Sequence, residues 1–120
     1  METDKAYSYI NLDYLNMMSD GDAEMKKVML GMLFEEMPLE LEKMAKFCAE
    51  ENWKELSSVA HKMKSTLSFV GNPEMTEANK TMEMLSKNAE DTGTYRGFID
   101  ILENTWPKVH EELQGVFDEL

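Results

Sequence analysis

Hydrophobic residues recur every three or four positions along the chain, in one short and four long segments. This spacing places apolar side chains on one face of an α-helix, and no stretch alternates as a strand would. Each long helix can bury its apolar stripe against antiparallel neighbours. The sequence therefore predicts an all-α protein, an antiparallel up-down four-helix bundle with a short extra N-terminal helix. We expect a single domain over 1–120, with helices at about 12–18, 20–51, 53–70, 73–89 and 94–117.

Proline and glycine mark where these helices are expected to bend or stop. Pro38 and Pro107 lie inside predicted helices, where proline removes a backbone hydrogen bond and clashes with the preceding turn. We expect a kink or a brief break at Pro38 and a disturbance at Pro107. Gly71 precedes Asn72-Pro73; glycine suits a left-handed C-cap, and proline suits the first turn of a helix. Gly71 is therefore the predicted stop of the 53–70 helix.

The helix predicted over 53–70 has two faces of different chemistry. Its apolar stripe, expected to be buried, consists of Trp53, Leu56, Ala60, Met63, Leu67 and Val70. At about 100° per residue, a second stripe is centred roughly 120° away from the first. That second stripe consists of Ser57, His61, Lys64, Ser65 and Ser68. The imidazole is therefore expected to face solvent, with a lysine one turn away and small residues around it.

Charge and composition argue against several classes of function. The net charge of -12 disfavours nucleic acid, whose binding needs cations to replace phosphate counterions, and an anionic membrane surface. No apolar run reaches the roughly 18 residues of a membrane span, and the first residues do not resemble a signal peptide. The cytoplasm is the expected location. A surface of this charge suits a partner with a basic patch.

The cysteine and most of the methionines are predicted to be packing residues. Cys48 is the only cysteine, so no internal disulfide can form, and its place on an apolar stripe predicts a small buried hydrophobe. The chain has twelve methionines, which we expect mainly in the core; the alternative is a methionine-lined docking groove. The methionines at core spacing are Met25, Met29, Met32, Met44, Met63, Met75 and Met82.

Most enzyme motifs are absent from the sequence. It contains neither a glycine-rich phosphate loop nor a His-Glu-x-x-His zinc motif. Cys48 and His61 lie on different stripes, which disfavours a Cys-His nucleophile. His110 sits among charged residues near the end of the chain and is predicted to be a solvated surface residue, because metal sites need several converging groups. The acidic residues are spread around the helices, so no metal site is predicted.

His61 remains as the candidate for chemistry. A free imidazole has a pKa of about 6.5, so at neutral pH a large fraction has a lone pair able to attack phosphorus. Lys64 lies one turn away on the same face, where its ammonium can reach an added phosphoryl group. The site has no base and no cleft, so it could hold a phosphoryl group but could not by itself drive the transfer. The simplest alternative is an exposed histidine with no role.

At these residues the chain resembles the histidine-containing phosphotransfer (HPt) domain family. The family pattern is Ala-His-x-Leu-Lys-Gly or Ser, with a glycine ten residues after the histidine. The resemblance covers about 12–87, and the final helix fits by its hydrophobic pattern only. The residues that fit are Ala60, His61, Lys64, Ser65 and Gly71, with Met63 in place of the commoner leucine.

The resemblance implies a phosphorelay carrier. His61 would accept a phosphoryl group from an aspartate of a response-regulator receiver domain, such as that of a hybrid histidine kinase, and pass it to another receiver. Lys64 would neutralise the phosphoryl charge. No cofactor is expected in this chain, because the receiver would supply Mg²⁺. The docking rim would be formed by Ser57, Lys62, Ser65 and Ser68.

Two departures and one alternative accompany the resemblance, and the first departure is Ser65 in place of the frequent glycine. Polar residues that some family members direct at the histidine from the next helix are not identifiable; Glu83 and Lys87 lie in about the right region without an assigned role. Glu42 and Lys80 are expected to lie away from the His61 helix. The chain would act as a monomer without kinase or phosphatase activity of its own. The alternative is a helical adaptor that binds a protein partner, with His61 incidental.

Overall fold

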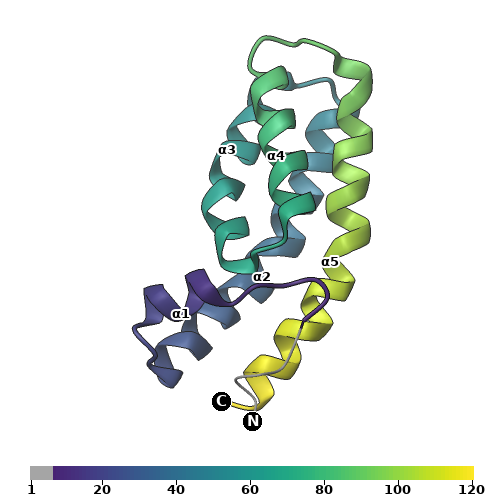
Figure 1. Cartoon of the computed structure of the whole chain (residues 1–120). Coiled ribbons are helices and arrows are strands. Elements are labelled where there is room, and N and C mark those ends of the chain that lie inside the picture. The colour runs from purple at the N-terminus through teal and green to yellow at the C-terminus, as the bar shows by residue number, and fades with distance from the viewer. Residues whose placement is uncertain (1–6) are drawn as a thin grey trace.

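The computed structural model describes residues 7–120, and these residues are helical apart from short turns and the N-terminal segment. The predicted fold class is confirmed: the described part of the chain contains five α-helices and no strand (Figure 1). No helix within it is both long and apolar enough to cross a membrane. The elements in chain order are α1 (Asp13–Ser19), α2 (Ala23–Ala49), α3 (Trp53–Val70), α4 (Pro73–Ser86), a 3-10 turn (Thr92–Thr94) and α5 (Tyr95–Asp118).

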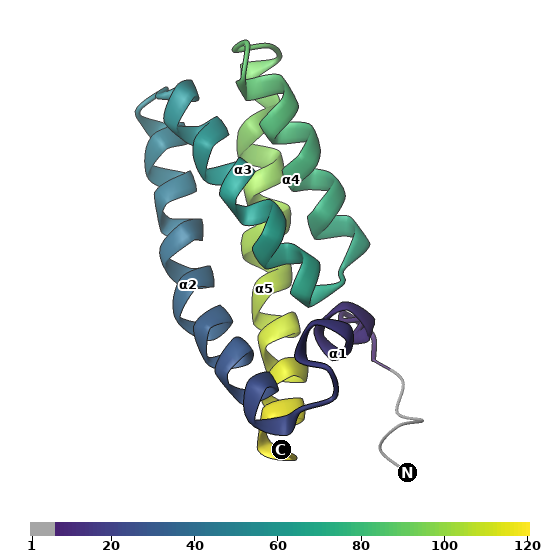
Figure 2. The ribbon, with the colours of Figure 1, turned by 90° about the vertical axis from the view of Figure 1, so that its left-hand side faces the viewer.

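The four long helices stand side by side and form an elongated bundle (Figures 1 and 2). Helix α2 packs on α3 and α5, and α4 packs on the same two helices. The short α1 contacts α2 and α3 near the turn that joins α3 to α4. The molecule measures 47 × 22 × 19 Å.

The core follows the predicted stripes. In α3 the apolar stripe is buried except for Trp53, which is half-buried and lies edge-on against Tyr95. Fully burying a large apolar side chain stabilises a fold by about 1.5–3 kcal/mol. Side chains of this kind come from all five helices: Leu15, Leu30, Met37, Met44, Leu56, Met63, Leu67, Met75, Met82, Tyr95, Ile99 and Leu102.

Side-chain caps set the starts of three helices. The side chains of Asp22, Asn52 and Asn72 each accept a hydrogen bond from the backbone N–H three residues later, which satisfies a donor that the first turn leaves open. The predicted end of α4 at 89 is three residues too late. Ala89 has a φ of 55°, which is left-handed backbone and stops the helix before it.

Neither proline interrupts its helix. Helix α2 is continuous through Pro38, and α5 is continuous through Pro107. Both prolines lie on exposed positions, where water can reach the carbonyl that loses its backbone partner. The brief break foreseen as one outcome at Pro38 does not occur.

Two of the methionines predicted to lie in the core do not lie there. Met25 and Met32 are 45% and 54% exposed, and Met29 is half-buried. The first half of α2 carries two adjacent apolar stripes, and the one that faces the core contains Leu30 and Leu33. Periodicity alone does not tell which of two such stripes is buried, because both have the helical spacing.

Cys48 and His110 both lie against the core. Cys48 is half-buried and packs against core residues, and burial raises the pKa of its thiol. The prediction of a solvated His110 is wrong. Its ring stacks on Trp106 with centroids 5.2 Å apart and meets Phe34 edge-on at 4.8 Å. His110 therefore helps α5 to pack on α2.

Gly71 is the only one of the six glycines at which an added Cβ would meet another atom within 4 Å. It has a φ of 70° at the C-cap of α3, as predicted. The segment before α1 crosses it closely: Asn11 donates its N–H to the Val70 carbonyl at 3.0 Å. A Cβ at position 71 would lie 2.5 Å from the Asn11 carbonyl oxygen. Only glycine fits here without displacing that segment.

We expect Gly71→Ala to destabilise the protein more than Gly21→Ala does. Gly21 also has a positive φ, 74°, but has no atom within 4 Å of an added Cβ. Left-handed backbone costs a residue with a Cβ about 1–2 kcal/mol, and the Gly71 variant adds an overpacking cost of about 1–3 kcal/mol. Urea unfolding of both variants measures the difference, and equal losses would contradict it.

Candidate functional site

His61 lies in the middle of α3 and faces solvent. Its side chain is 72% exposed, whereas its neighbours Ala60 and Met63 on the other side of the helix are fully buried. The helix is thus held by its apolar stripe, and the imidazole is carried on a rigid support. This orientation is the one that the two-stripe pattern predicts.

A carboxylate from the next helix holds the ring. His61 Nδ1 lies 2.7 Å from Oε2 of Glu83 on α4, and the Glu83 side chain is only 12% exposed. A carboxylate accepts hydrogen bonds but donates none, so the neutral imidazole in this contact carries its proton on Nδ1. Nε2 is then left with a free lone pair on the exposed edge of the ring. The pair presents a nucleophilic nitrogen in a fixed orientation.

Hydrogen bonds between α3 and α4 fix the position of Glu83. The Ser57 hydroxyl donates to the Glu83 backbone carbonyl at 3.3 Å. One turn before Glu83, the buried Asn79 donates from its side-chain amide to the Ala60 carbonyl at 2.8 Å. On α3 the two bonds are made at Ser57 and Ala60, within the turn before His61. They set the register of the helices, and with it the distance between the imidazole and the carboxylate.

Lys64 shares the same carboxylate. Its ammonium lies 3.9 Å from Oε1 of Glu83, and its side chain is 58% exposed. Lys64 also borders a hollow of 190 Å³ whose lining includes Glu83, Lys80 and Lys87. The expectation that Lys80 lies away from the site is wrong. In a chain with a net charge of -12, three lysines thus gather beside the one exposed imidazole of the described residues.

The four residues predicted as a docking rim lie on two different sides of His61. Ser57 faces α4 and is bonded to it, as described above. Lys62 faces α2, where its ammonium lies 3.2 Å from the buried carboxylate of Glu40. Ser65 is exposed, and the Ser68 hydroxyl donates to the Lys64 carbonyl at 3.1 Å. Ser57 therefore belongs to the α4 side of His61, and Lys62 belongs to the α2 side.

An apolar groove lies on the α2 side of His61. It has a volume of 340 Å³, and we call it the methionine groove. Ser65, one turn after His61, belongs to its wall. Phe69 extends the groove toward α1, because Tyr14 meets it edge-on with ring centroids 5.1 Å apart. The groove is lined by Met29, Met32, Leu33, Glu36, Ser65, Thr66 and Phe69.

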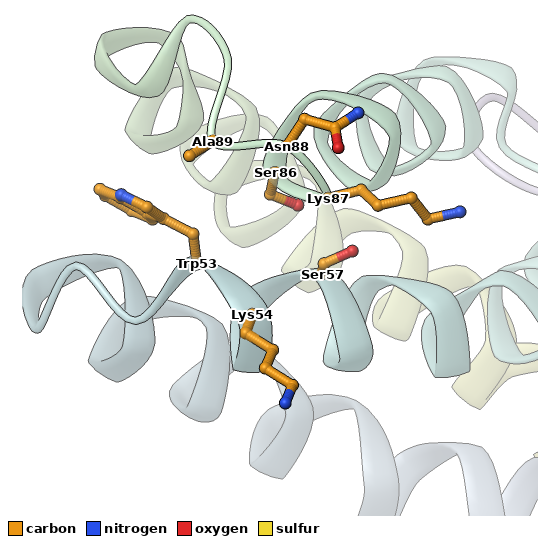
Figure 3. A pocket seen from close by; sticks show the side chains of 7 residues that line it. All are labelled: Trp53, Lys54, Ser57, Ser86, Lys87, Asn88 and Ala89. Carbon is orange, nitrogen blue, oxygen red and sulfur yellow. The ribbon is translucent and has the colours of Figure 1, made fainter.

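A larger hollow lies toward the other end of α3 and α4 (Figure 3). It has a volume of 450 Å³, and Trp53, Ser57 and Ser86 are among its lining residues. Two lysines border it, but Lys54 and Lys87 point in different directions, away from one another (Figure 3). Their charges do not converge on one anion in this arrangement. The arrangement suited to phosphoryl chemistry is therefore the one around His61.

Sequence reasoning did not assign a role to Glu83. A signal for it exists in α4, where the buried polar residues Asn79, Glu83 and Ser86 recur at helical spacing. Polar residues on a buried stripe need partners, and this stripe faces α3. Among residues 7–120, no group of three or more His, Cys, Asp or Glu side chains is placed to hold a metal ion.

Comparison with known families identifies the class. The family model of the Hpt domain matches residues 28–118, which is most of the chain, so the chain belongs to the Hpt domain family. Hpt domains are helical bundles that carry phosphoryl groups in two-component signalling and interact with receiver domains. A search of curated proteins and a search of solved structures each found no significant match.

We expect Glu83→Ala to change the tautomer of His61. In the wild type, nitrogen NMR of the neutral ring should show the proton on Nδ1, because Glu83 accepts it. Glu83→Ala removes the acceptor and should lower the share of this tautomer. Glu77→Ala is the matched control on an exposed position of α4. The assignment is wrong if the wild-type and Glu83→Ala rings give the same tautomer ratio.

Proposed function

We propose that this chain is a phosphorelay intermediate. His61 accepts a phosphoryl group from the aspartyl phosphate of one receiver domain and passes it to the aspartate of another. The observation that carries the proposal is the His61–Glu83 pair. It combines an exposed imidazole with a nearly buried carboxylate 2.7 Å from Nδ1, which leaves Nε2 as the reactive atom.

In this proposal the transfer is an in-line displacement. The lone pair of Nε2 attacks phosphorus, an N–P bond forms, and the P–O bond to the donor aspartate breaks, so that the aspartate leaves as a carboxylate. No base is needed at Nε2, since it carries no proton. The ring gains positive charge as the bond forms, and Glu83 stabilises that charge through Nδ1–H, as a buried carboxylate does beside other catalytic imidazoles. The reverse reaction loads the second receiver.

Lys64 is the proposed neutraliser of the phosphoryl charge. Its side chain is exposed and is held near His61 by Glu83 at 3.9 Å, so it can turn to a phosphoryl group on Nε2. Phosphoryl transfer depends on stabilising charge on the equatorial oxygens and usually uses Mg²⁺. We place that Mg²⁺ in the receiver. This chain then supplies the nucleophile, the lysine and a rigid platform, and it acts as a cytoplasmic monomer without enzymatic activity of its own.

A helical adaptor is the competing function. The methionine groove supports it, since exposed apolar grooves often bind proteins. An adaptor would not need a histidine held by a buried carboxylate, whereas a phosphocarrier would. The two functions differ in one simple observable, because only the phosphocarrier forms a covalent adduct, which is stable in alkali and labile in acid.

We expect His61→Gln to abolish phosphoryl uptake. The test incubates the protein with a receiver domain that carries labelled phosphate and follows the label on this chain. His110→Gln is the matched control, because His110 is the other histidine of the chain and packs against the rings of Phe34 and Trp106. It should keep uptake near the wild-type rate. Uptake by His61→Gln at the wild-type rate would refute the proposed acceptor.

We expect Ser65→Trp to slow the transfer by at least about 10-fold, equivalent to about 1.4 kcal/mol, while the protein stays folded. Ser65 is exposed one turn from His61, where a receiver must approach within bonding distance. Glu42→Trp introduces the same bulk on an exposed position of α2 and serves as the control. Transfer rates are compared, with circular dichroism as the test of folding. Normal transfer by a folded Ser65→Trp variant would place the docking surface elsewhere.

A further inference from the structure

The methionines of the described chain divide into two groups. Five are fully inaccessible in the core: Met37, Met44, Met63, Met75 and Met82. Five others are exposed: Met17, Met18, Met25, Met32 and Met84. Met29 is half-buried. An oxidant in solution therefore meets some thioethers directly and is kept from others by the fold.

Two methionines that are not buried lie close to the proposed phosphoacceptor. Met29 and Met32 both line the methionine groove, and Ser65 of the His61 face lines it with them. Met25 lies one turn before Met29 on the same side of α2. On α1, Met17 and Met18 follow one turn after Tyr14, whose ring contacts Phe69 in the groove. Helices α2 and α3 thus line the groove, and Tyr14 brings α1 against its Phe69 edge.

The occupant of this groove is, in the proposed function, the receiver domain. Ser65 belongs both to the groove wall and to the surface one turn from His61, so the two surfaces are continuous. A receiver that brings its aspartate to Nε2 covers this neighbouring surface. Methionine suits such a surface, because its flexible, polarizable side chain adapts to different partners. The groove would serve the donor and the acceptor receiver alike.

We propose that Met29 and Met32 form a reversible oxidation site that controls receiver docking. This inference rests on the proposed function. Hydrogen peroxide is the oxidant: the thioether sulfur attacks one peroxide oxygen, an S–O bond forms and the O–O bond breaks. The other oxygen leaves as hydroxide, which takes the proton of the transferred hydroxyl group and becomes water. The sulfur loses two electrons and the peroxide gains them. The product is methionine sulfoxide, which methionine sulfoxide reductases return to the thioether.

Oxidation changes the groove without changing the fold. The sulfoxide oxygen is a strong acceptor that water satisfies in the free protein. A docked receiver removes that water from an apolar groove and leaves the oxygen without a partner, which disfavours the complex. The methionines of the core are inaccessible and keep their packing. The expected result is a folded protein that transfers at least about 10-fold more slowly.

The experiment treats the protein with dilute hydrogen peroxide and measures phosphoryl uptake from a receiver. Mass spectrometry should find sulfoxide at Met29 and Met32 and none at Met37 or Met63, while circular dichroism stays unchanged. A variant with both Met29→Leu and Met32→Leu conserves side-chain volume. Its transfer rate after peroxide should equal its own rate before peroxide, whatever that starting rate is. Met84→Leu removes the exposed methionine of the lysine hollow, on the α4 side of His61, and leaves the groove intact. Peroxide should slow its transfer by the same factor as in the wild type.

Two results would overturn the inference. One is unchanged uptake by wild-type protein that carries sulfoxide at Met29 and Met32. The other is an equal loss of uptake in the Met29→Leu, Met32→Leu variant, which would place the sensitive site elsewhere. A wild-type protein that takes up no label before peroxide would instead refute the proposed function, and this inference with it. Phosphoryl uptake by the untreated protein thus distinguishes a failure of the proposed function from a failure of the oxidation site.

Discussion

The contact between His61 and Glu83 is the interaction on which the site depends. Glu83 is almost buried on α4, and its carboxylate contacts the imidazole at 2.7 Å and Lys64 at 3.9 Å. A buried carboxylate is costly without partners, so this position is compatible with folding because α3 brings a histidine and a lysine to it. The same contact orients the ring. The packing of α3 on α4 therefore also orients the imidazole.

Most of the fold follows from hydrophobic spacing. The helix order and the stop at Gly71 could be predicted because each depends on residues close in sequence. The exposure of Met25 and Met32 could not, since the first half of α2 carries two apolar stripes and only the placement of its neighbours decides which is buried. His110 illustrates the same limit. Its flanking charges suggest solvent, whereas Phe34 on another helix packs edge-on against it.

The site could be predicted in part. The outward direction of His61 and the nearness of Lys64 follow from positions within one helix. Glu83 lies 22 residues away, and its contact depends on how α4 is rotated and shifted against α3. Spacing within either helix does not encode that rotation. The hydrogen bonds that Ser57 and Asn79 make between the two helices set this rotation. Which side chains line the groove beside Ser65 likewise depends on how α2 packs against α3.

The two sides of His61 differ in a way that gives the surface a direction. Toward α4 lie Glu83 and the lysine hollow, and toward α2 lies the methionine groove. A partner with one acidic and one apolar region matches this surface in one orientation, with its acidic region over the lysines and its apolar region over the groove. Turned by half a circle, the same partner would meet lysines with its apolar side and methionines with its charges. The exposed His61 ring is therefore open to solvent, yet a partner of this kind would reach it in one orientation only.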